Sequence, residues 1–114
     1  MPSPMERTLK ELKGNPACLF AQKVEHWNPW ARKRIDLWGA DVQAIFSTHI
    51  LAIQVTSITG NAEHVRDALK SKEVNAWVNA GGHFEVWAWR KLKKVGWEAK
   101  KTVIGAETWS SHDE

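Results

Sequence analysis

Several residue types are scarce in this 114-residue sequence, and each shortage narrows the class of protein. Cys18 is the only cysteine, so an intramolecular disulfide and any zinc site with two or more thiolates are excluded. We therefore expect a reducing compartment. No 18 apolar residues follow one another, and the charged start contains no apolar run of signal-peptide length. The sequence thus predicts a cytoplasmic protein with no membrane partner.

Tyrosine is absent and phenylalanine is rare, whereas tryptophan is abundant, with eight Trp against three Phe. A chain of this length has room for one domain. We expect that domain to span residues 1–104 and residues 105–114 to form a polar tail. Most of the tryptophan is then expected to fill a small core, and Trp87 and Trp89, on one face of a predicted strand, fit burial against a helix.

The net charge of +3 is distributed unevenly along the chain. Residues 90–101 carry six basic residues and one acidic residue, so the net charge of this segment alone is larger than that of the whole chain. A second basic cluster follows the pair Trp27 and Trp30. Basic clusters interleaved with flat aromatic rings suit a nucleic acid, although such a run is also typical of a solvated hairpin. The candidate nucleic-acid contacts in the two clusters are Trp27, Trp30, Arg32, Lys33, Arg34, Arg90, Lys91, Lys93 and Lys94.

Periodicity and turn signals predict an α/β protein with a mixed sheet flanked by helices. Ser3, Pro4 and Glu6 form an N-terminal capping pattern, and Asn61 is the expected N-cap of a second helix. Pro29 excludes a central strand from the arm around it. The expected elements are a helix over 4–13, strands over 17–25, 40–46 and 50–57, an irregular arm over 26–35, a helix that continues or restarts from 61 to 80, and strands over 83–90 and 97–104.

Polar residues within the apolar hairpin strands point to a functional site, because burying them costs free energy unless they are paired. Strand alternation places Asp41 on one face of the first strand, and Gln54 and Thr56 on one face of the second. An even-numbered turn, over 47–48 or 46–49, pairs positions whose numbers add to 95. Asp41 then lies opposite Gln54 on the same face, with Thr56 diagonal to it.

Other ligand patterns are absent from the sequence. The five histidines have no i, i+2 or i, i+4 spacing, so we expect no zinc site. Cys18 lies in an apolar strand and is expected in the core. The Gly81-Gly82 pair precedes a strand and not a helix, so it is no phosphate loop, and we expect no small-molecule cofactor.

The run RIDLWGADVQAIFSTHILAIQVTS, at residues 34–57, followed by a predicted helix and strand, resembles the PD-(D/E)xK nuclease superfamily. Within it, the chain is similar to small Holliday-junction-resolvase-like proteins often carried by phages. Asp41 matches the acid of the motif, Gln54 matches the first position of the (E/D/Q)-x-K tripeptide, and Thr56 falls where the lysine is expected. The resemblance implies a restriction-endonuclease-like αβββαβ core over roughly 3–104. It also implies a homodimer, working in the host-cell cytoplasm if phage-encoded.

The function implied by this resemblance is metal-dependent cleavage of branched or otherwise structured duplex DNA. Mg²⁺ or Mn²⁺ would be held by Asp41, the Gln54 amide oxygen and the Val55 carbonyl, with Asp36 as a further candidate that could instead pair with Arg34. Glu6 matches the glutamate that the first helix lends in resolvase-like members, and its alternative role is in the capping pattern. The candidates that would replace the missing lysine are Arg66, Lys70, Lys33 and Arg34.

Two other functions remain open from the sequence. One is a catalytically inactive DNA-binding module of the same fold, in which Thr56 marks the loss of chemistry. The other is a structural or protein-interaction domain whose Trp residues form a partner surface.

Overall fold

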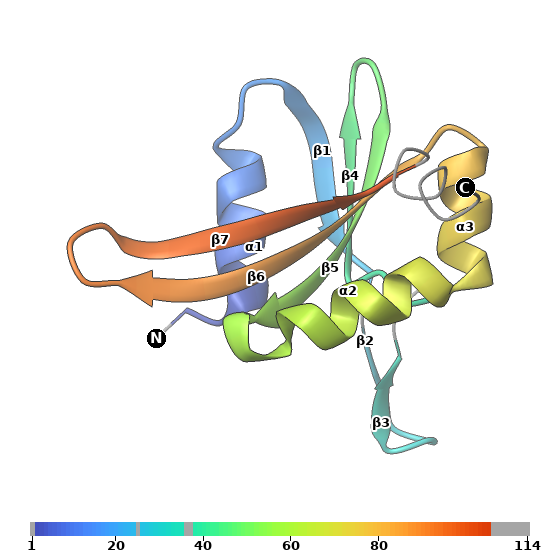
Figure 1. Ribbon diagram of the computed structural model, residues 1–114, viewed down its shortest axis with the longest axis horizontal. Helices are drawn as coiled ribbons and strands as arrows, with labels where there is room; N and C mark the ends of the chain where they lie inside the picture. The colour runs from blue at the N-terminus through green and yellow to red at the C-terminus, as the bar shows by residue number, and fades with distance from the viewer. Residues whose placement is uncertain (1, 25, 36–37, 106–114) are drawn as a thin grey trace.

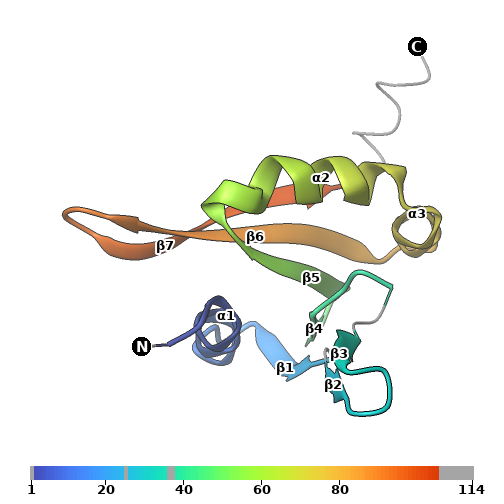
Figure 2. The ribbon, with the colours of Figure 1, turned by 90° about the horizontal axis from the view of Figure 1, so that it is seen from below.

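Helices pack on both faces of a five-stranded sheet (Figures 1 and 2). The structure is a computed structural model that describes residues 2–24, 26–35 and 38–105. In chain order its elements are α1 (Pro4–Lys13), β1 (Cys18–Lys23), β2 (His26–Asn28), β3 (Lys33–Ile35), β4 (Val42–Phe46), β5 (Ile50–Ser57), the 3₁₀ turn η1 (Ile58–Gly60), α2 (Asn61–Lys70), α3 (Lys72–Asn79), β6 (His83–Leu92) and β7 (Gly96–Ile104).

The strand order in the main sheet is β1-β4-β5-β6-β7. Neighbouring strands are antiparallel except β5 and β6, which are parallel because α2 and α3 carry the chain back across the sheet. The prediction of an α/β protein with a mixed sheet flanked by helices is therefore confirmed. None of the described helices is long and apolar enough to span a membrane.

The β4–β5 hairpin has the predicted register. Val42 pairs with Ile53 and Gln43 with Ala52, so the paired numbers add to 95. Alternation along these strands divides the core into two layers. Side chains of one layer pack against α1, namely Val42, Ala44, Leu51, Ile53, Trp87 and Trp89. Side chains of the other pack against α2 and α3, namely Ala52, Phe84, Val86 and Ile104.

Both faces of β6 are buried, which explains its four consecutive buried residues from Val86 to Trp89. Trp87 and Trp89 face α1, as predicted, and are 3% and 6% exposed. Trp89 Nε1 donates a hydrogen bond of 2.9 Å to Thr8 Oγ1 on α1. Cys18 is half-buried and packs against this layer, in agreement with its predicted core position. The tryptophans of β6 therefore build the core.

Two local predictions need correction, and an open alternative is decided. The arm over 26–35 forms a two-stranded ribbon, β2 with β3, because Pro29 falls in its turn, where a missing N–H costs nothing. Gly60, not Asn61, is the N-cap of α2, since η1 already coils the chain before the helix. Of the two alternatives for the second helical segment, the helix restarts: the chain leaves the helical path at Ser71, whose Oγ accepts a hydrogen bond from the Val74 N–H and caps α3. Most of the predicted tail, residues 106–114, lies outside the described residues.

Candidate functional site

Asp41 lies at the edge of the sheet where β4 begins and β5 ends. Its backbone joins three strands, because its N–H donates to the Ile53 carbonyl at 2.8 Å and its carbonyl accepts from the Val24 N–H at 2.9 Å. Val24 follows β1 directly. The ends of β1, β4 and β5 therefore converge on Asp41.

The Asp41 carboxylate is turned toward the last residues of β5. Its Oδ2 accepts a hydrogen bond of 2.8 Å from the Val55 N–H, in the place where a longer β4 would offer a backbone carbonyl. The N–H and C=O of one strand residue point to the same neighbouring strand, so the Val55 carbonyl also faces the side of Asp41. This places a carboxylate and a backbone carbonyl on one side of β5.

The segment leading into Asp41 is anchored by aromatic packing. Trp38 adopts a positive φ of 41° and Gly39 a φ of 99°, which turn the chain sharply before β4. The Trp38 ring packs at centroid distances of 5.3 Å from Trp77 and 6.1 Å from Phe84. Contacts of the Trp38 ring with α3 and β6 therefore hold the strained backbone in place. They also fix the position of Asp41, which directly precedes β4.

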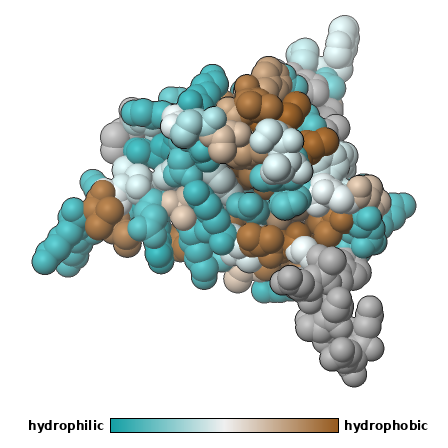
Figure 3. Space-filling model, turned by 90° about the horizontal axis from the view of Figure 1, so that it is seen from above, coloured by the Kyte–Doolittle hydropathy of each residue, from teal (hydrophilic) through white to brown (hydrophobic). Residues whose placement is uncertain are grey.

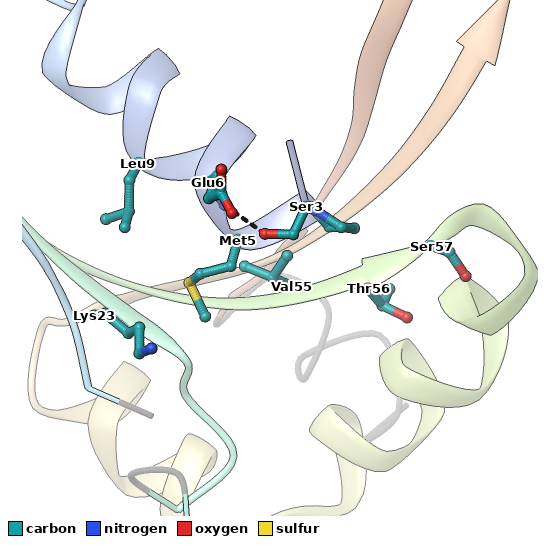
Figure 4. Close-up of a pocket in the computed structure, with 9 residues that line it drawn as sticks. Ser3, Met5, Glu6, Leu9, Lys23, Val55, Thr56 and Ser57 are labelled. Atoms are coloured by element: carbon teal, nitrogen blue, oxygen red, sulfur yellow. Dashed lines mark hydrogen bonds between the residues drawn. The ribbon is translucent and has the colours of Figure 1, made fainter. Parts of the chain in front are cut away.

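A cleft of about 560 Å³ opens beside this edge, between the first turns of α1 and the end of β5 (Figure 4). Glu6 from α1 and Lys23 from β1 are its charged residues. Val55 lines the cleft and also receives the Asp41 carboxylate on its N–H, so it connects the two parts of the site. The full lining is Ser3, Pro4, Met5, Glu6, Leu9, Lys23, Val55, Thr56 and Ser57.

Glu6 takes part in the predicted helix cap through its backbone. The Ser3 Oγ accepts a hydrogen bond of 3.1 Å from the Glu6 N–H (Figure 4). The Glu6 side chain is exposed, and its carboxylate makes no hydrogen bond or ion pair with another described residue. Glu6 therefore combines the capping position with a carboxylate at the cleft.

Gln54 and Thr56 lie on the face of β5 that is turned toward α2. Gln54 alternates with the Ala52 side chain of that layer and is half-buried. The Thr56 hydroxyl lies against η1, since a methyl group at Gly60 would come within 2.7 Å of Thr56 Oγ1. Figure 4 shows this hydroxyl directed away from Glu6. Thr56 therefore lines the cleft without directing its polar atom toward the two charged residues.

The cation at the cleft is Lys23, which the sequence interpretation missed. Lys23 pairs with Val42, so its side chain shares the α1 face of the sheet. The register of β1 on β4 would have revealed this position, but a bulge between Cys18 and Phe20 hides that register from pattern reasoning. Arg66 and Lys70 are exposed on α2 and Lys33 on β3, and none of them lines the cleft. Asp36 and the side chain of Arg34 lie outside the described part of the structure.

Two hairpins project from the sheet in different directions, β6–β7 to the left and β2–β3 downward in Figure 1. We call residues 26–35 the finger, since the β2–β3 ribbon connects the end of β1 to the start of β4. We call residues 90–97 the arm, since β6 runs parallel to β5 and continues past its end, from Trp89 opposite Ser57 to the turn before Gly96. The site thus lies between two projecting basic elements.

The predicted basic residues are presented on these hairpins. Lys91, Lys93 and Lys94 are exposed on the arm, whereas Arg90 pairs with Glu98 across it at 3.3 Å. In Figure 3 the projection at the left is mostly hydrophilic. Arg32, Lys33 and Trp30 are exposed on the finger, and the side chain of Trp27 lies outside the described part of the structure.

The oxygen donors at this edge fit a hard divalent cation with one principal anionic ligand. Asp41 offers a carboxylate and Val55 a carbonyl on the same side of β5, and the half-buried Gln54 lies next to Val55 in the chain. Among the described residues no three His, Cys, Asp or Glu side chains gather into a metal-binding group.

No protein-family model, curated protein or solved structure matches the chain. A carboxylate at a strand end, a carboxylate and an ammonium group across a cleft, and two basic hairpins suit the binding of a phosphodiester chain.

Proposed function

We propose that the protein binds branched or otherwise structured duplex DNA and cleaves it with the help of Mg²⁺ or Mn²⁺, as the PD-(D/E)xK nucleases do. The observation that carries this proposal is the Asp41 carboxylate bonded to Val55 of the cleft, on a sheet from which two basic hairpins project. The element order supports it. A helix precedes three antiparallel strands, and a helical crossover leads to a strand parallel to the third, which is the αβββαβ order of the superfamily.

Each residue of the site has a proposed role. Asp41 would hold the cation together with Gln54 and the Val55 carbonyl, and the bound cation would activate water and neutralise charge on the phosphate. Lys23 supplies, from the α1 face of the sheet, the positive charge that Thr56 lacks, and it contacts a phosphate that enters the cleft. Glu6 accepts a proton or a hydrogen bond from water that enters the cleft.

A second function is favoured by two contacts. One oxygen of Asp41 is already used by the Val55 N–H, and the Thr56 hydroxyl is directed toward Gly60. Both contacts stabilise the strand end without any metal. They suit a module of the same fold that grips DNA and does not cut it.

We also propose that two copies of the chain associate at the end of the sheet opposite the cleft. Phe20, Ile45 and Ile50 pair across three neighbouring strands and form an exposed apolar row. Apolar side chains gather on the face seen from above in Figure 3. Among the described residues β1 pairs with β4 alone, and we propose that its outer backbone edge meets the same edge of a second copy. A two-fold axis beside β1 would bring two such rows together.

The decisive experiment is cleavage of a four-way junction and of a linear duplex with Mn²⁺, comparing wild type with Asp41→Asn. An asparagine keeps an oxygen that can accept the Val55 N–H, so the variant removes the charge and leaves the strand end intact. We expect cleavage to fall on the order of a hundredfold or more while DNA affinity is retained. Lys23→Gln is expected to lower cleavage in the same assay.

The matched control is Asp67→Asn, which removes an exposed carboxylate on α2, away from the cleft. Its cleavage should equal that of wild type. Equal cleavage by wild type and Asp41→Asn would refute the active-site assignment. Tight DNA binding with no cleavage, and no uptake of Mn²⁺ by calorimetry, would establish the non-cleaving module instead.

A further inference from the structure

Trp30 is the most exposed large apolar residue described in the chain, with 94% of its surface accessible. It lies at the tip of the finger, which projects from the body of the domain (Figure 1). Tryptophan is usually well buried, because removing its large ring from water is strongly favourable. A ring held in water at the end of a projection is therefore positioned for a partner.

The finger presents this ring on an ordered turn. Asn28 Oδ1 accepts hydrogen bonds from the N–H groups of both Trp30 and Ala31, at 2.9 and 3.1 Å. Pro29 restricts its own φ, and Arg32 closes the turn with a positive φ of 54°. Little conformational entropy remains to be lost at this turn when the ring meets a partner.

The charge of the finger specifies what kind of partner fits. Residues 26–35 contain three basic residues and no acidic residue. Arg32 and Lys33 are exposed close to Trp30 in the sequence. A flat aromatic ring surrounded by positive charge suits a nucleic acid base whose flanking phosphates contact the cations.

The base faces of a continuous duplex are covered by their stacked neighbours, and Trp30 has no surface to stack on there. A face becomes available where the stack is interrupted, at a branch point, a fork or a strand end. The finger is rooted between Val24 and Ala40, next to Asp41.

We propose that Trp30 stacks on the base left exposed at an interruption of duplex DNA, and that this contact selects branched or forked DNA over continuous duplex. The inference rests on the proposed function, since it specifies which DNA the site receives. It depends on the finger alone and holds for a cleaving or a non-cleaving protein.

The test measures binding of the full chain, in EDTA to prevent cleavage, to a forked duplex and a continuous duplex of equal length. The fork carries 2-aminopurine at its first unpaired position. For Trp30→Ala we expect a loss on the order of tenfold in affinity for the fork, little change for the duplex, and loss of the 2-aminopurine quenching. Trp30→Phe keeps an aromatic face and should restore part of the affinity and of the quenching.

Two controls isolate the ring from charge and from exposed apolar surface. Lys33→Gln should weaken binding to both DNAs by a similar factor, because phosphate contacts carry no preference for a fork. Val103→Ala, at an exposed residue on β7, should change neither affinity. Equal effects of Trp30→Ala on fork and duplex, or no effect on either, would overturn the inference while leaving DNA binding intact. If wild type binds neither DNA, the proposed function fails and the inference fails with it.

Discussion

One buried hydrogen bond fixes α1, and with it Glu6, over the sheet. Trp89 Nε1 donates to Thr8 Oγ1, and the Thr8 hydroxyl donates to the Pro4 carbonyl one turn earlier. Thr8 is fully buried, the only buried polar residue described. The wall of the cleft that carries Glu6 therefore depends on a polar contact within an apolar layer.

Thr8→Val keeps the shape of the side chain and removes the acceptor of this bond. The Trp89 N–H then remains buried without a partner, which should lower the free energy of unfolding by about 1–3 kcal/mol. Urea unfolding followed by tryptophan fluorescence measures the loss. Thr48→Val, at an exposed turn position, should change stability by less than about 0.5 kcal/mol. Similar losses for both variants would contradict a specific role for the buried bond.

The position of Asp41 beside β5 was predictable because strand alternation and an even-numbered turn leave one register for the hairpin. Lys23 was not predictable, since its place at the cleft depends on how β1 pairs with β4 and how α1 crosses them. Such contacts join residues far apart in the sequence. Local patterns therefore identify the residues of one hairpin but not the opposite wall of a cleft.

At the scale of elements, the two projecting hairpins illustrate the same limit. Pro29 correctly excludes a central strand, but it does not distinguish an irregular arm from a two-stranded ribbon that places the proline in its turn. The long β6–β7 pair was predicted nearly in full, because apolar alternation continues through Trp89. The projection of this pair beyond β5 depends on how β6 pairs with β5. The last residue of β5, Ser57, pairs with Trp89, so the final three residues of β6, 90–92, continue past the end of β5.

The arm should contribute DNA affinity without choosing among DNA structures. Lys93→Gln combined with Lys94→Gln removes two exposed charges from its turn. We expect weaker binding to fork and duplex alike, and a salt dependence of the binding constant whose logarithmic slope falls by about 1 to 2. Fluorescence anisotropy over a series of salt concentrations measures both quantities.

The control for the arm is Lys72→Gln, at an exposed residue at the start of α3, on the side of the molecule away from the arm (Figure 1). This variant has one charge fewer but should leave the salt slope unchanged. If it flattens the slope as much as the arm variant does, net charge and not the arm governs binding.

At the scale of the whole molecule, the cleft and the apolar row lie at opposite ends of β4 and β5. Asp41 precedes β4, whereas Ile45 and Ile50 flank the turn that joins the two strands. Association through the row would leave both clefts, both fingers and both arms of a dimer exposed. A branched DNA offers two strands for cleavage, so a two-fold assembly with outward sites matches the symmetry of such a substrate.

Phe20→Lys should convert this dimer into single chains, because a charge in the row is desolvated when two copies meet. Light scattering should give twice the chain mass for wild type and the mass of one chain for the variant, while circular dichroism stays unchanged since Phe20 is half exposed. Val103→Lys is the matched control, because Val103 is 61% exposed on β7 at the other edge of the sheet. It should leave the wild-type mass unaltered. A single chain mass for wild type would refute the dimer, and dissociation by Val103→Lys but not by Phe20→Lys would move the interface to β7.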